Sequence, residues 1–413
     1  MKRFSGLELR SLSVNTLTQF LVRIFSSFAT LTATLIIAYF LGLDAVGSFT
    51  KVTTFVSLFY LFLDFGFNSI LLRDNFADTE KKIGNLTLLR LVIAIALIPI
   101  ISILASILPY NEIAGTGFSA IEKHAITIFA FVLVGIALQN SLQVFLQKKM
   151  IYARGVMPGF VSSVIVVIVV LYAVYTGNFF LLFAAYVLAG ISQAVITYAG
   201  LRNDFNLRLS VSKIGFFSKS LFLKSWPLGL MLVFNLLYAK IDVVLLSFYK
   251  PSTDVGIYGV SYRFFEVALA LPAFLANSTY PVLLKHMGDG NGYKKIFGKY
   301  LKLYIVLSLI VTALVFLGAP FISILKGGFF LSVIPLQILS LSLPFFFLTS
   351  LLQWHFLIKN RLAFLAPLYG GALLLNVVLN ILLVPHFSYY AAAVITGVCE
   401  ALVFVVMLWY FRK

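Results

Sequence analysis

Charged residues inside long apolar segments are the part of this sequence best suited to chemistry. Arg23 lies in the apolar segment 14–42 and Asp64 in the segment 46–72, and polar residues recur every three or four positions beside each. Residues at that spacing share one face of a helix. An ionised group deep in a bilayer is costly unless it faces protein or water, so both faces are predicted to line one watery groove. The alternative is an ion pair between Arg23 and Asp64 that only holds two helices together.

The second half of the chain contains further charges of this kind. In the segment 222–249, Lys240 and Asp242 project to nearly opposite sides of a helix, so they cannot simply neutralise each other. In the following segment Arg263 precedes Glu266 by about one turn, and these two can pair along the helix. Lys240 lies too deep to reach the membrane surface comfortably. We expect Lys240, Arg263 or both at a central cleft, with a purely structural role as the alternative.

These residues stand in a chain with the composition of a membrane protein. Its 413 residues are 61% hydrophobic and 11% charged, with a mean hydropathy of +1.04, which excludes an ordinary soluble protein. Apolar runs long enough to cross a bilayer recur throughout, so the predicted fold class is all-α and polytopic, with about 12 spans. The expected spans are 14–42, 46–72, 85–109, 122–147, 157–176, 179–201, 222–249, 255–284, 299–325, 331–358, 362–384 and 388–411.

The distribution of basic residues orients these spans. The formal net charge is +17, but most Lys and Arg fall in connections on one side of the predicted membrane, such as Lys148–Arg154 and Lys285–Lys299. Basic connections stay cytoplasmic, so both termini are predicted to be cytoplasmic. The charge therefore indicates orientation and gives no reason to expect nucleic-acid binding.

An internal repeat predicts two lobes. The segment 35–40 aligns with 244–249, and 46–49 then aligns with 255–258 without a gap, so that small and aromatic residues coincide. Two halves of six spans each enter the membrane in the same orientation, as parallel repeats do in several transporters. We expect two parallel six-helix lobes around a central cavity. Their predicted bounds are residues 1–213 and 214–413.

The sequence contains no recognisable motif for catalysis, metal binding or nucleotide binding. Cys399 is the only cysteine, the four histidines are scattered, and no paired spacing typical of a metal site occurs. The glycine-rich loop 288–299 lacks the spacing of a phosphate-binding loop, and Tyr300 stands where that motif requires Ser or Thr. We therefore expect no metal, no cofactor, no ATP hydrolysis and no enzymatic activity.

Short motifs in the first two spans resemble a known family. The motifs are Ala38-Tyr39-Phe40-Leu41-Gly42, Val46-Gly47-Ser48-Phe49 and Asp64-Phe65-Gly66-Phe67, followed by Arg73. They resemble the polysaccharide transporter family of O-antigen flippases, which shares a superfamily with MATE multidrug exporters and lipid II flippases. The resemblance implies a cationic cavity that opens alternately to each face of the bacterial inner membrane. Its implied cargo is an undecaprenyl-diphosphate-linked oligosaccharide, moved to the periplasmic leaflet during lipopolysaccharide or related polysaccharide biosynthesis. The polymerase machinery is an implied partner.

That implied cargo suits the intramembrane residues. A diphosphate headgroup cannot cross hydrocarbon unaided, and cations offset its desolvation. The predicted cationic residues are Arg23, Lys240 and Arg263. Sugars suit amides and aromatic rings, and the candidates are Gln19, Tyr60, Asn235, Tyr238 and Tyr262. Candidates for binding a coupling proton or Na⁺ are the acids Asp64, Asp242, Glu266 and Glu400.

Two other functions stay open. A cation-coupled drug or solute antiporter of the same fold prefers an acidic cavity. In this chain the four intramembrane acids are balanced by four cations, Arg23, Lys51, Lys240 and Arg263. A membrane glycosyltransferase or polymerase predicts a large polar outer loop, and the longest outer loop, 109–120, is small. Twelve spans also leave no room for the extra helix pair of the lipid II flippases. The identity of the sugar unit is not readable from one sequence.

Overall fold

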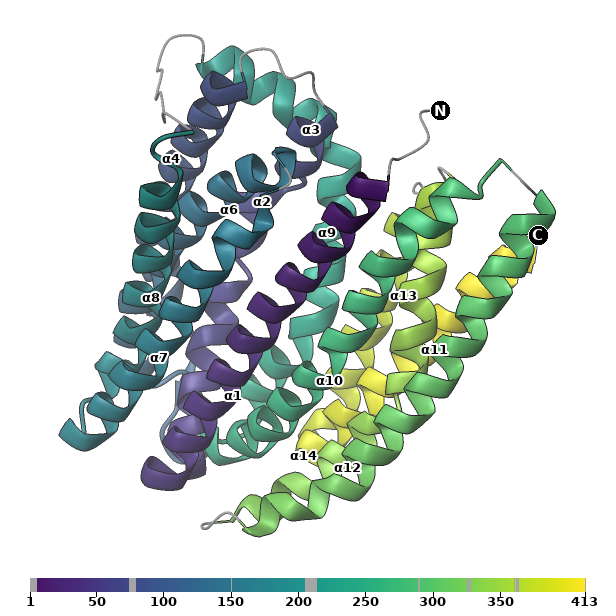
Figure 1. Ribbon diagram of the computed structural model, residues 1–413. Helices are drawn as coiled ribbons and strands as arrows, with labels where there is room; N and C mark the ends of the chain where they lie inside the picture. Colours follow the sequence, from purple (N-terminus) through teal and green to yellow (C-terminus); the bar gives the residue numbers. More distant parts are fainter. Residues whose placement is uncertain are drawn as a thin grey trace. The chain divides into compact units, whose positions relative to one another are not determined.

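The computed structural model describes residues 6–73, 79–149, 151–204, 214–288, 290–324, 328–359, 361 and 364–412, and within these ranges the side chains of residues 6–24 are among those left undescribed. The first half contains α1 (Gly6–Ser57), α2 (Tyr60–Asp64), α3 (Phe67–Arg73), α4 (Thr79–Ser106), β1 (Tyr110–Asn111), β2 (Thr116–Gly117), α5 (Ala120–Ala130), α6 (Val132–Lys148), η1 (Tyr152–Gly155), α7 (Val156–Thr176) and α8 (Phe179–Leu201) (Figure 1). The second half contains α9 (Ile214–Tyr249), α10 (Ser252–Lys285), α11 (Gly290–Gly318), η2 (Ala319–Ile324), η3 (Phe329–Ser332), α12 (Val333–Ser340), α13 (Leu343–Ile358) and α14 (Leu365–Arg412). The chain is thus almost entirely helical, as predicted.

The number of spans agrees with the expected twelve. In the described residues nine helices are long and apolar enough to cross a membrane, and a tenth span is the pair Phe329–Ser340 and Leu343–Ile358, bent by 42°. Two of the nine have 48 residues, about 72 Å at 1.5 Å per residue, which is more than twice the bilayer core. Non-helical backbone divides them at Gly42 (φ 84°) and Ser388 (φ 51°). Each long helix therefore supplies two spans, and the chain is a multi-pass membrane protein.

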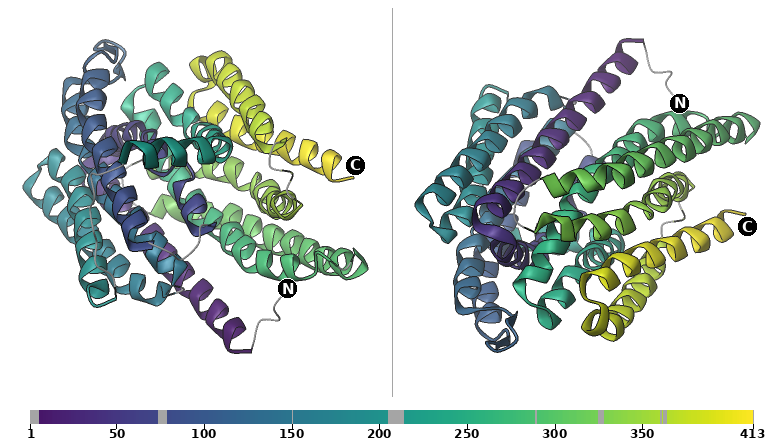
Figure 2. Two further views of the ribbon diagram at one scale, coloured as in Figure 1. Left: turned by 90° about the horizontal axis from the view of Figure 1, so that it is seen from above. Right: turned by 90° about the horizontal axis from the view of Figure 1, so that it is seen from below.

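The helices pack into two units. Unit 1 comprises Met1–Ile36, Lys51–Tyr110 and Phe118–Leu236, and unit 2 comprises Ile37–Thr50, Asn111–Gly117 and Leu237–Lys413. Within each unit the helices lie side by side as a bundle (Figure 2). Two short pieces of the first half of the chain thus pack with the second half. The lobe boundary proposed after residue 213 stays a prediction.

A broken helix shapes the core of unit 1. Phe65 (φ 33°) and Gly66 (φ 75°) both adopt left-handed backbone, which ends α2 and lets α3 start in a new direction. The Phe65 ring stacks on Phe222 of α9 with ring centroids 5.0 Å apart. It lies so close to Gly229 that a Cβ there would stand 2.4 Å from the ring. The motif Asp64-Phe65-Gly66-Phe67 therefore forms a helix break that docks on α9.

A close helix crossing in unit 2 reflects the repeat. A Cβ at Gly47 of α1 would lie 1.6 Å from the Ser252 carbonyl oxygen, and a Cβ at Gly256 of α10 would lie 2.0 Å from the Leu43 carbonyl oxygen. Leu43 and Gly47 align with Ser252 and Gly256 in the internal repeat. Equivalent residues thus contact each other reciprocally, as in a two-fold interface. The repeat read from the sequence accounts for this crossing, and glycine is required at both positions.

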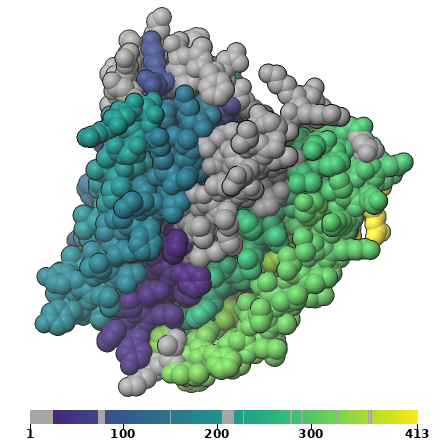
Figure 3. Space-filling model, in the orientation of Figure 1, coloured from purple at the N-terminus to yellow at the C-terminus, as the bar shows by residue number. Residues whose placement is uncertain are grey.

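Large apolar side chains cover the outside of both units. On α7 the exposed residues include Ile168 and Tyr175, and on α11 they include Leu314 and Leu317, which are 67% and 70% exposed. Both helices lie at the molecular surface, together with α8 and α12 (Figure 3). Apolar surface of this extent is typical of a lipid-facing protein. Some polar and charged side chains, however, are buried in the interior.

Candidate functional site

Among the side chains that the structure describes, the most buried cation lies in unit 1 beside the helix break. Arg90 of α4 is fully buried, and its Nη2 donates to Asp64 Oδ1 at 3.1 Å and to Asn68 Oδ1 at 2.7 Å. Its Nε donates to the Leu63 carbonyl at 2.5 Å, and its Nη1 to Ser141 Oγ at 3.2 Å. The guanidinium thereby satisfies a carbonyl that the break leaves without a helical partner. Asp64 has its ion-pair partner here.

Arg90 is not among the site residues predicted from the sequence. It stands near the start of the predicted span 85–109, where a long side chain can reach the membrane surface. The structure turns it inward because the broken helix offers it a carboxylate, an amide and a carbonyl. The expected partner of Asp64 was Arg23, whose side chain, like that of Gln19, lies outside the described residues. The prediction for Arg23 and Gln19 therefore stays open.

A second buried ion pair in unit 1 joins α1 to α5. Lys51 Nζ lies 3.6 Å from Glu122 Oε1, and both side chains are at most 2% exposed. The ammonium also lies 5.9 Å from the centre of the Phe118 ring, within cation–π range. Glu122 completes a capping box with Ser119 at the start of α5. Lys51 therefore holds a helix end in place.

Unit 2 contains a group of charges that is partly exposed. Glu266 bridges two cations, with its Oε1 2.8 Å from Lys240 Nζ and its Oε2 2.8 Å from Arg263 Nη1. The side chains of Lys240 and Arg263 are each 22% exposed. Lys240 also lies 5.3 Å from the ring of Tyr262, whose hydroxyl donates to the Ala239 carbonyl. The expected ion pair between Arg263 and Glu266 is present, and the three side chains together carry one net positive charge.

Asp242 lies in a buried polar cluster of a different kind. Its carboxylate is 4% exposed and accepts hydrogen bonds from Thr396 Oγ1 at 2.6 Å and from Asn380 Nδ2 at 2.9 Å. Asn380 Nδ2 also donates to Asn376 Oδ1 at 2.8 Å, and Asn380 Oδ1 is buried with no hydrogen-bond partner among the described residues. Tyr258 OH lies 3.3 Å from Thr396 Oγ1. Only neutral groups contact this carboxylate in the described part of the chain.

Glu400 lies one helical turn beyond Thr396 on α14 and has similar surroundings. It is 3% exposed, and it accepts hydrogen bonds from Thr349 Oγ1 at 2.5 Å and from Tyr238 OH at 3.1 Å. Tyr238 is itself buried, with its ring 6.3 Å from that of Tyr369. Tyr238 was expected to contact sugar, but its hydroxyl donates a hydrogen bond to the Glu400 carboxylate. Among described residues, no cation pairs with Glu400 either.

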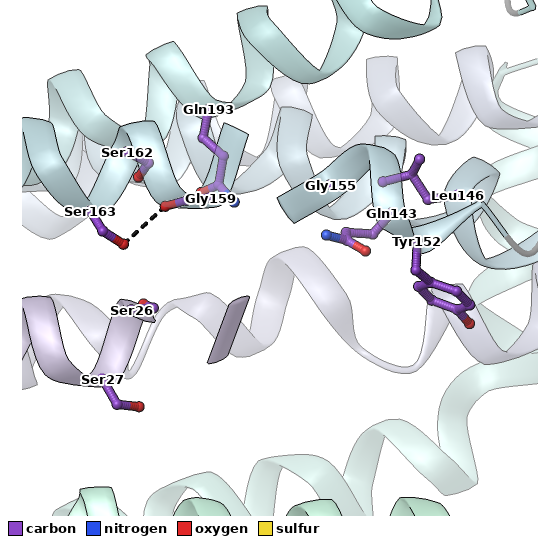
Figure 4. A pocket seen from close by; sticks show the side chains of 10 residues that line it. All are labelled: Ser26, Ser27, Gln143, Leu146, Tyr152, Gly155, Gly159, Ser162, Ser163 and Gln193. Atoms are coloured by element: carbon purple, nitrogen blue, oxygen red, sulfur yellow. Dashed lines mark hydrogen bonds between the residues drawn. The ribbon is translucent and has the colours of Figure 1, made fainter. Parts of the chain in front are cut away.

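Unit 1 also has a neutral pocket of about 470 Å³. It is lined by Ser26, Ser27, Gln143, Leu146, Tyr152, Gly155, Gly159, Ser162, Ser163 and Gln193. In Figure 4, Gln143 and Ser163 point into the space from one side, and Ser26 lies across it on α1. Ser26 and Ser27 belong to the polar stripe that the sequence predicts beside Arg23. The pocket lining carries no charged side chain among the residues that the structure describes.

The remaining predicted residues are dispersed. Tyr60 begins α2 and is half-buried, and Asn235 lies on α9, where it is also half-buried. Asn235 belongs to unit 1, whereas Tyr238, Lys240 and Asp242 on the same helix belong to unit 2. The structure therefore brings together Lys240, Arg263, Glu266 and Tyr262, and it gives Asp242 and Glu400 separate surroundings.

A protein-family model described as "Polysaccharide biosynthesis protein" matches residues 9–287, which is more than half of the chain. The chain belongs to this family. The resemblance stated from the first two spans is thereby confirmed at the level of the family. No curated protein sequence is significantly similar to the chain.

Solved structures show which fold this polysaccharide biosynthesis protein has. The structure titled "Lipid II flippase MurJ, inward closed conformation" superposes with a TM-score of 0.75 at 16% identity, covering 97% of this chain and 87% of the other. An inward-facing multidrug resistance MATE transporter of the MOP superfamily superposes with a TM-score of 0.73 at 15% identity. The match covers 96% of this chain and 97% of the other. A MOP superfamily transporter from Pyrococcus furiosus superposes with a TM-score of 0.68 at 15% identity. The match covers 100% of this chain and 98% of the other. At such low identities the likeness shows the fold alone.

Proposed function

We propose that this polysaccharide biosynthesis protein is a flippase that moves an undecaprenyl-diphosphate-linked oligosaccharide from the cytoplasmic to the periplasmic leaflet by alternating access. The oligosaccharide is an O-antigen unit or a related surface polysaccharide unit. The observation that carries the proposal is the family match over residues 9–287, in a chain with the fold of a lipid II flippase. The protein acts in the bacterial inner membrane with both termini in the cytoplasm, and it delivers its cargo to the polymerase machinery.

The group Lys240–Glu266–Arg263 supports an anionic cargo. Its excess positive charge stands within helices long enough to cross the membrane. A diphosphate is a poor solute in hydrocarbon, and a guanidinium binds phosphate oxygens through paired hydrogen bonds. We assign the headgroup to Lys240 and Arg263, with Arg23 as a further cation. Glu266 keeps both cations in place between cargoes.

Sugar contacts and ion coupling can be divided among the other candidates. We assign sugars to Gln19, Tyr60, Asn235 and Tyr262, and we place Tyr238 with Glu400, to which it donates a hydrogen bond. Of the four candidate acids, Asp64 pairs with Arg90 and Glu266 with two cations. Only Asp242 and Glu400 have no cation partner among described residues. A buried carboxylate without a cation partner holds a proton or a cation, so we assign coupling to these two.

The oxygen-rich surroundings of Asp242 suit a small hard cation as well as a proton. The side-chain oxygens of Asn376, Asn380 and Thr396 gather near the carboxylate, and Asn380 Oδ1 accepts nothing in the described part of the chain. Hard cations prefer carboxylate, amide and hydroxyl oxygens. Occupancy of Asp242 by Na⁺ or a proton in one state of the transport cycle links the gradient to movement of the cargo.

The test is a strain that lacks this gene. Lipid-linked oligosaccharides are extracted and identified by mass, and their leaflet is assigned by access to an added periplasmic glycosidase. The expected result is accumulation of completed units on the cytoplasmic face and loss of surface polysaccharide. Normal surface glycans with no accumulated intermediate would contradict the flippase. The second candidate, a cation-coupled antiporter, is favoured by the likeness to a MATE transporter and predicts increased drug sensitivity instead.

A further inference from the structure

The lining residues of the neutral pocket all belong to unit 1, whereas Lys240, Arg263 and Glu266 belong to unit 2. We propose that this pocket is the subsite for the uncharged sugars of the cargo. The proposal rests on the flippase function and adds to it the place where the glycan is recognised. The cations named above keep the role of binding the diphosphate, and the hydroxyls and amides of the pocket bind the sugar.

The amides in the pocket have unused hydrogen-bonding capacity. Gln143 of α6 and Gln193 of α8 are half-buried, and their side-chain amides make no hydrogen bond to described residues. Within a membrane protein a polar group without a partner is costly, so such groups point to water or to a ligand. Each amide offers two donors and one acceptor. Adjacent sugar hydroxyls donate and accept in the same way, and they complement this set.

The lining also matches the two-sided character of a sugar ring. The side chains of Ser26 and Ser162 add hydroxyls, whereas Leu146 and the ring of Tyr152 supply apolar surface. A pyranose likewise presents hydroxyls around its edge and C–H groups on its faces. A volume of about 470 Å³ lies within the usual range for small-molecule pockets. Without a charged group in the described lining, the pocket offers nothing specific to a cationic drug or to a phosphate.

Small residues of α7, and Gly155 directly before it, keep the pocket open. Gly155, Gly159, Ser162 and Ser163 recur at helical spacing, so they form one stripe. The Ser163 hydroxyl donates to the Gly159 carbonyl at 2.9 Å (Figure 4), which holds this side chain against its own helix. A Cβ at Gly155 would lie 3.3 Å from Leu146 Cδ1, tighter than ordinary contact. The pocket therefore has a wall that tolerates little added volume.

The experiment measures which lipids the full-length protein retains. Purified protein in nanodiscs is incubated with the lipid-linked oligosaccharide extract of the native cells and an equal amount of undecaprenyl diphosphate without sugar, and the bound lipids are quantified by mass spectrometry. We compare the variants Gln143→Leu and Gln193→Leu with the control Gln147→Leu, which lies one turn from Gln143 on α6 outside the pocket. Thermal unfolding of each variant confirms that it is folded.

The expected result is a selective loss of glycolipid. Loss of the hydrogen bonds of one amide should lower the ratio of glycolipid to bare diphosphate roughly three- to tenfold, and Gln147→Leu should leave this ratio at the wild-type value. An unchanged ratio in both pocket variants, or a wild-type protein that prefers the bare lipid, overturns the subsite while the flippase stands. A wild-type protein that retains neither lipid overturns the flippase and the subsite together.

Discussion

The two units bury charge in opposite ways. In unit 1 the buried cations Arg90 and Lys51 each contact a carboxylate, so positive and negative charge balance locally. In unit 2 the buried carboxylates Asp242 and Glu400 contact only hydroxyls and amides among described residues. A balanced pair needs nothing further. A carboxylate in hydrocarbon surroundings without a cation needs a proton or a metal ion to enter, and that ion can leave again.

This difference separates charges that maintain the fold from charges that can perform a cycle. The partners of Arg90 include a backbone carbonyl at a helix break, and that contact is needed in every state of the transporter. The contacts of Asp242 are side chains on α14, and they change with its charge. We therefore expect substitutions of Arg90 and Lys51 to reduce stability and substitutions of Asp242 and Glu400 to reduce transport.

The largest effect is expected for Arg90→Leu. The substitution leaves the Leu63 carbonyl and Asn68 without their donor, and it removes the partner of the Asp64 carboxylate, which is 45% exposed. Each buried polar group left unpaired costs about 1–3 kcal/mol, so several lost contacts add up. We expect little folded protein in the membrane, measured by fluorescence-detected chromatography of a fusion. The control is Arg154→Leu, which removes an exposed ion pair with Asp204 and should cost about 0–1 kcal/mol. If the two variants were equally stable to heat, Arg90 would not be one of the charges that maintain the fold.

Lys51 gives a second test of the same class. Lys51→Met alone leaves the Glu122 carboxylate buried without its cation, and we expect a loss of about 3 kcal/mol. Adding Glu122→Gln removes the charge and keeps an oxygen that can accept the Ser119 N–H hydrogen bond. The double variant should therefore recover most of the stability in thermal unfolding. A double variant no more stable than Lys51→Met would show that the pair is not held by charge balance.

The opposite result is expected for Asp242→Asn. Its neighbours Thr396 and Asn380 are neutral, and their side chains can rotate to form hydrogen bonds with an amide. The free energy of unfolding should therefore change by less than about 1 kcal/mol. Flipping in proteoliposomes should fall about tenfold or more and lose its dependence on the Na⁺ or proton gradient, in line with usual coupling free energies. Asp64→Asn, which alters an acid already paired with Arg90, serves as the control. A gradient-dependent Asp242→Asn protein would move the coupling role to Glu400.

The sequence predicts what depends on local spacing. Apolar length indicated twelve spans, the separation of Arg263 and Glu266 indicated their ion pair, and the aligned glycines 47 and 256 indicated a repeat that the structure shows as a reciprocal contact. Partners from distant helices were not predictable. Asn380 and Thr396 stand 138 and 154 residues from Asp242, and only packing decides that they meet it. The same holds for Arg90, whose inward orientation depends on the break at Phe65.

The smallest effects are expected in the partly exposed group Lys240–Glu266–Arg263 of unit 2. It is neither a fully buried ion pair nor a buried carboxylate without a cation partner. Lys240→Gln and Arg263→Gln each remove the excess positive charge but leave Glu266 one cation, so stability should hardly change. Because water screens these side chains, loss of one cation is worth roughly 0.5–1 kcal/mol, or about a two- to fivefold weaker binding of undecaprenyl diphosphate.

Glu266→Gln changes the same group in the other direction. It raises the net charge at the group by one unit and releases both cations, so binding of undecaprenyl diphosphate should become tighter, measured by the same nanodisc retention. Slower release should then reduce flipping, even though the protein is folded. Tighter binding combined with slower transport would identify Glu266 as the residue that returns the headgroup site to its empty state. Weaker binding in Glu266→Gln would show instead that Glu266 orients the two cations for the diphosphate.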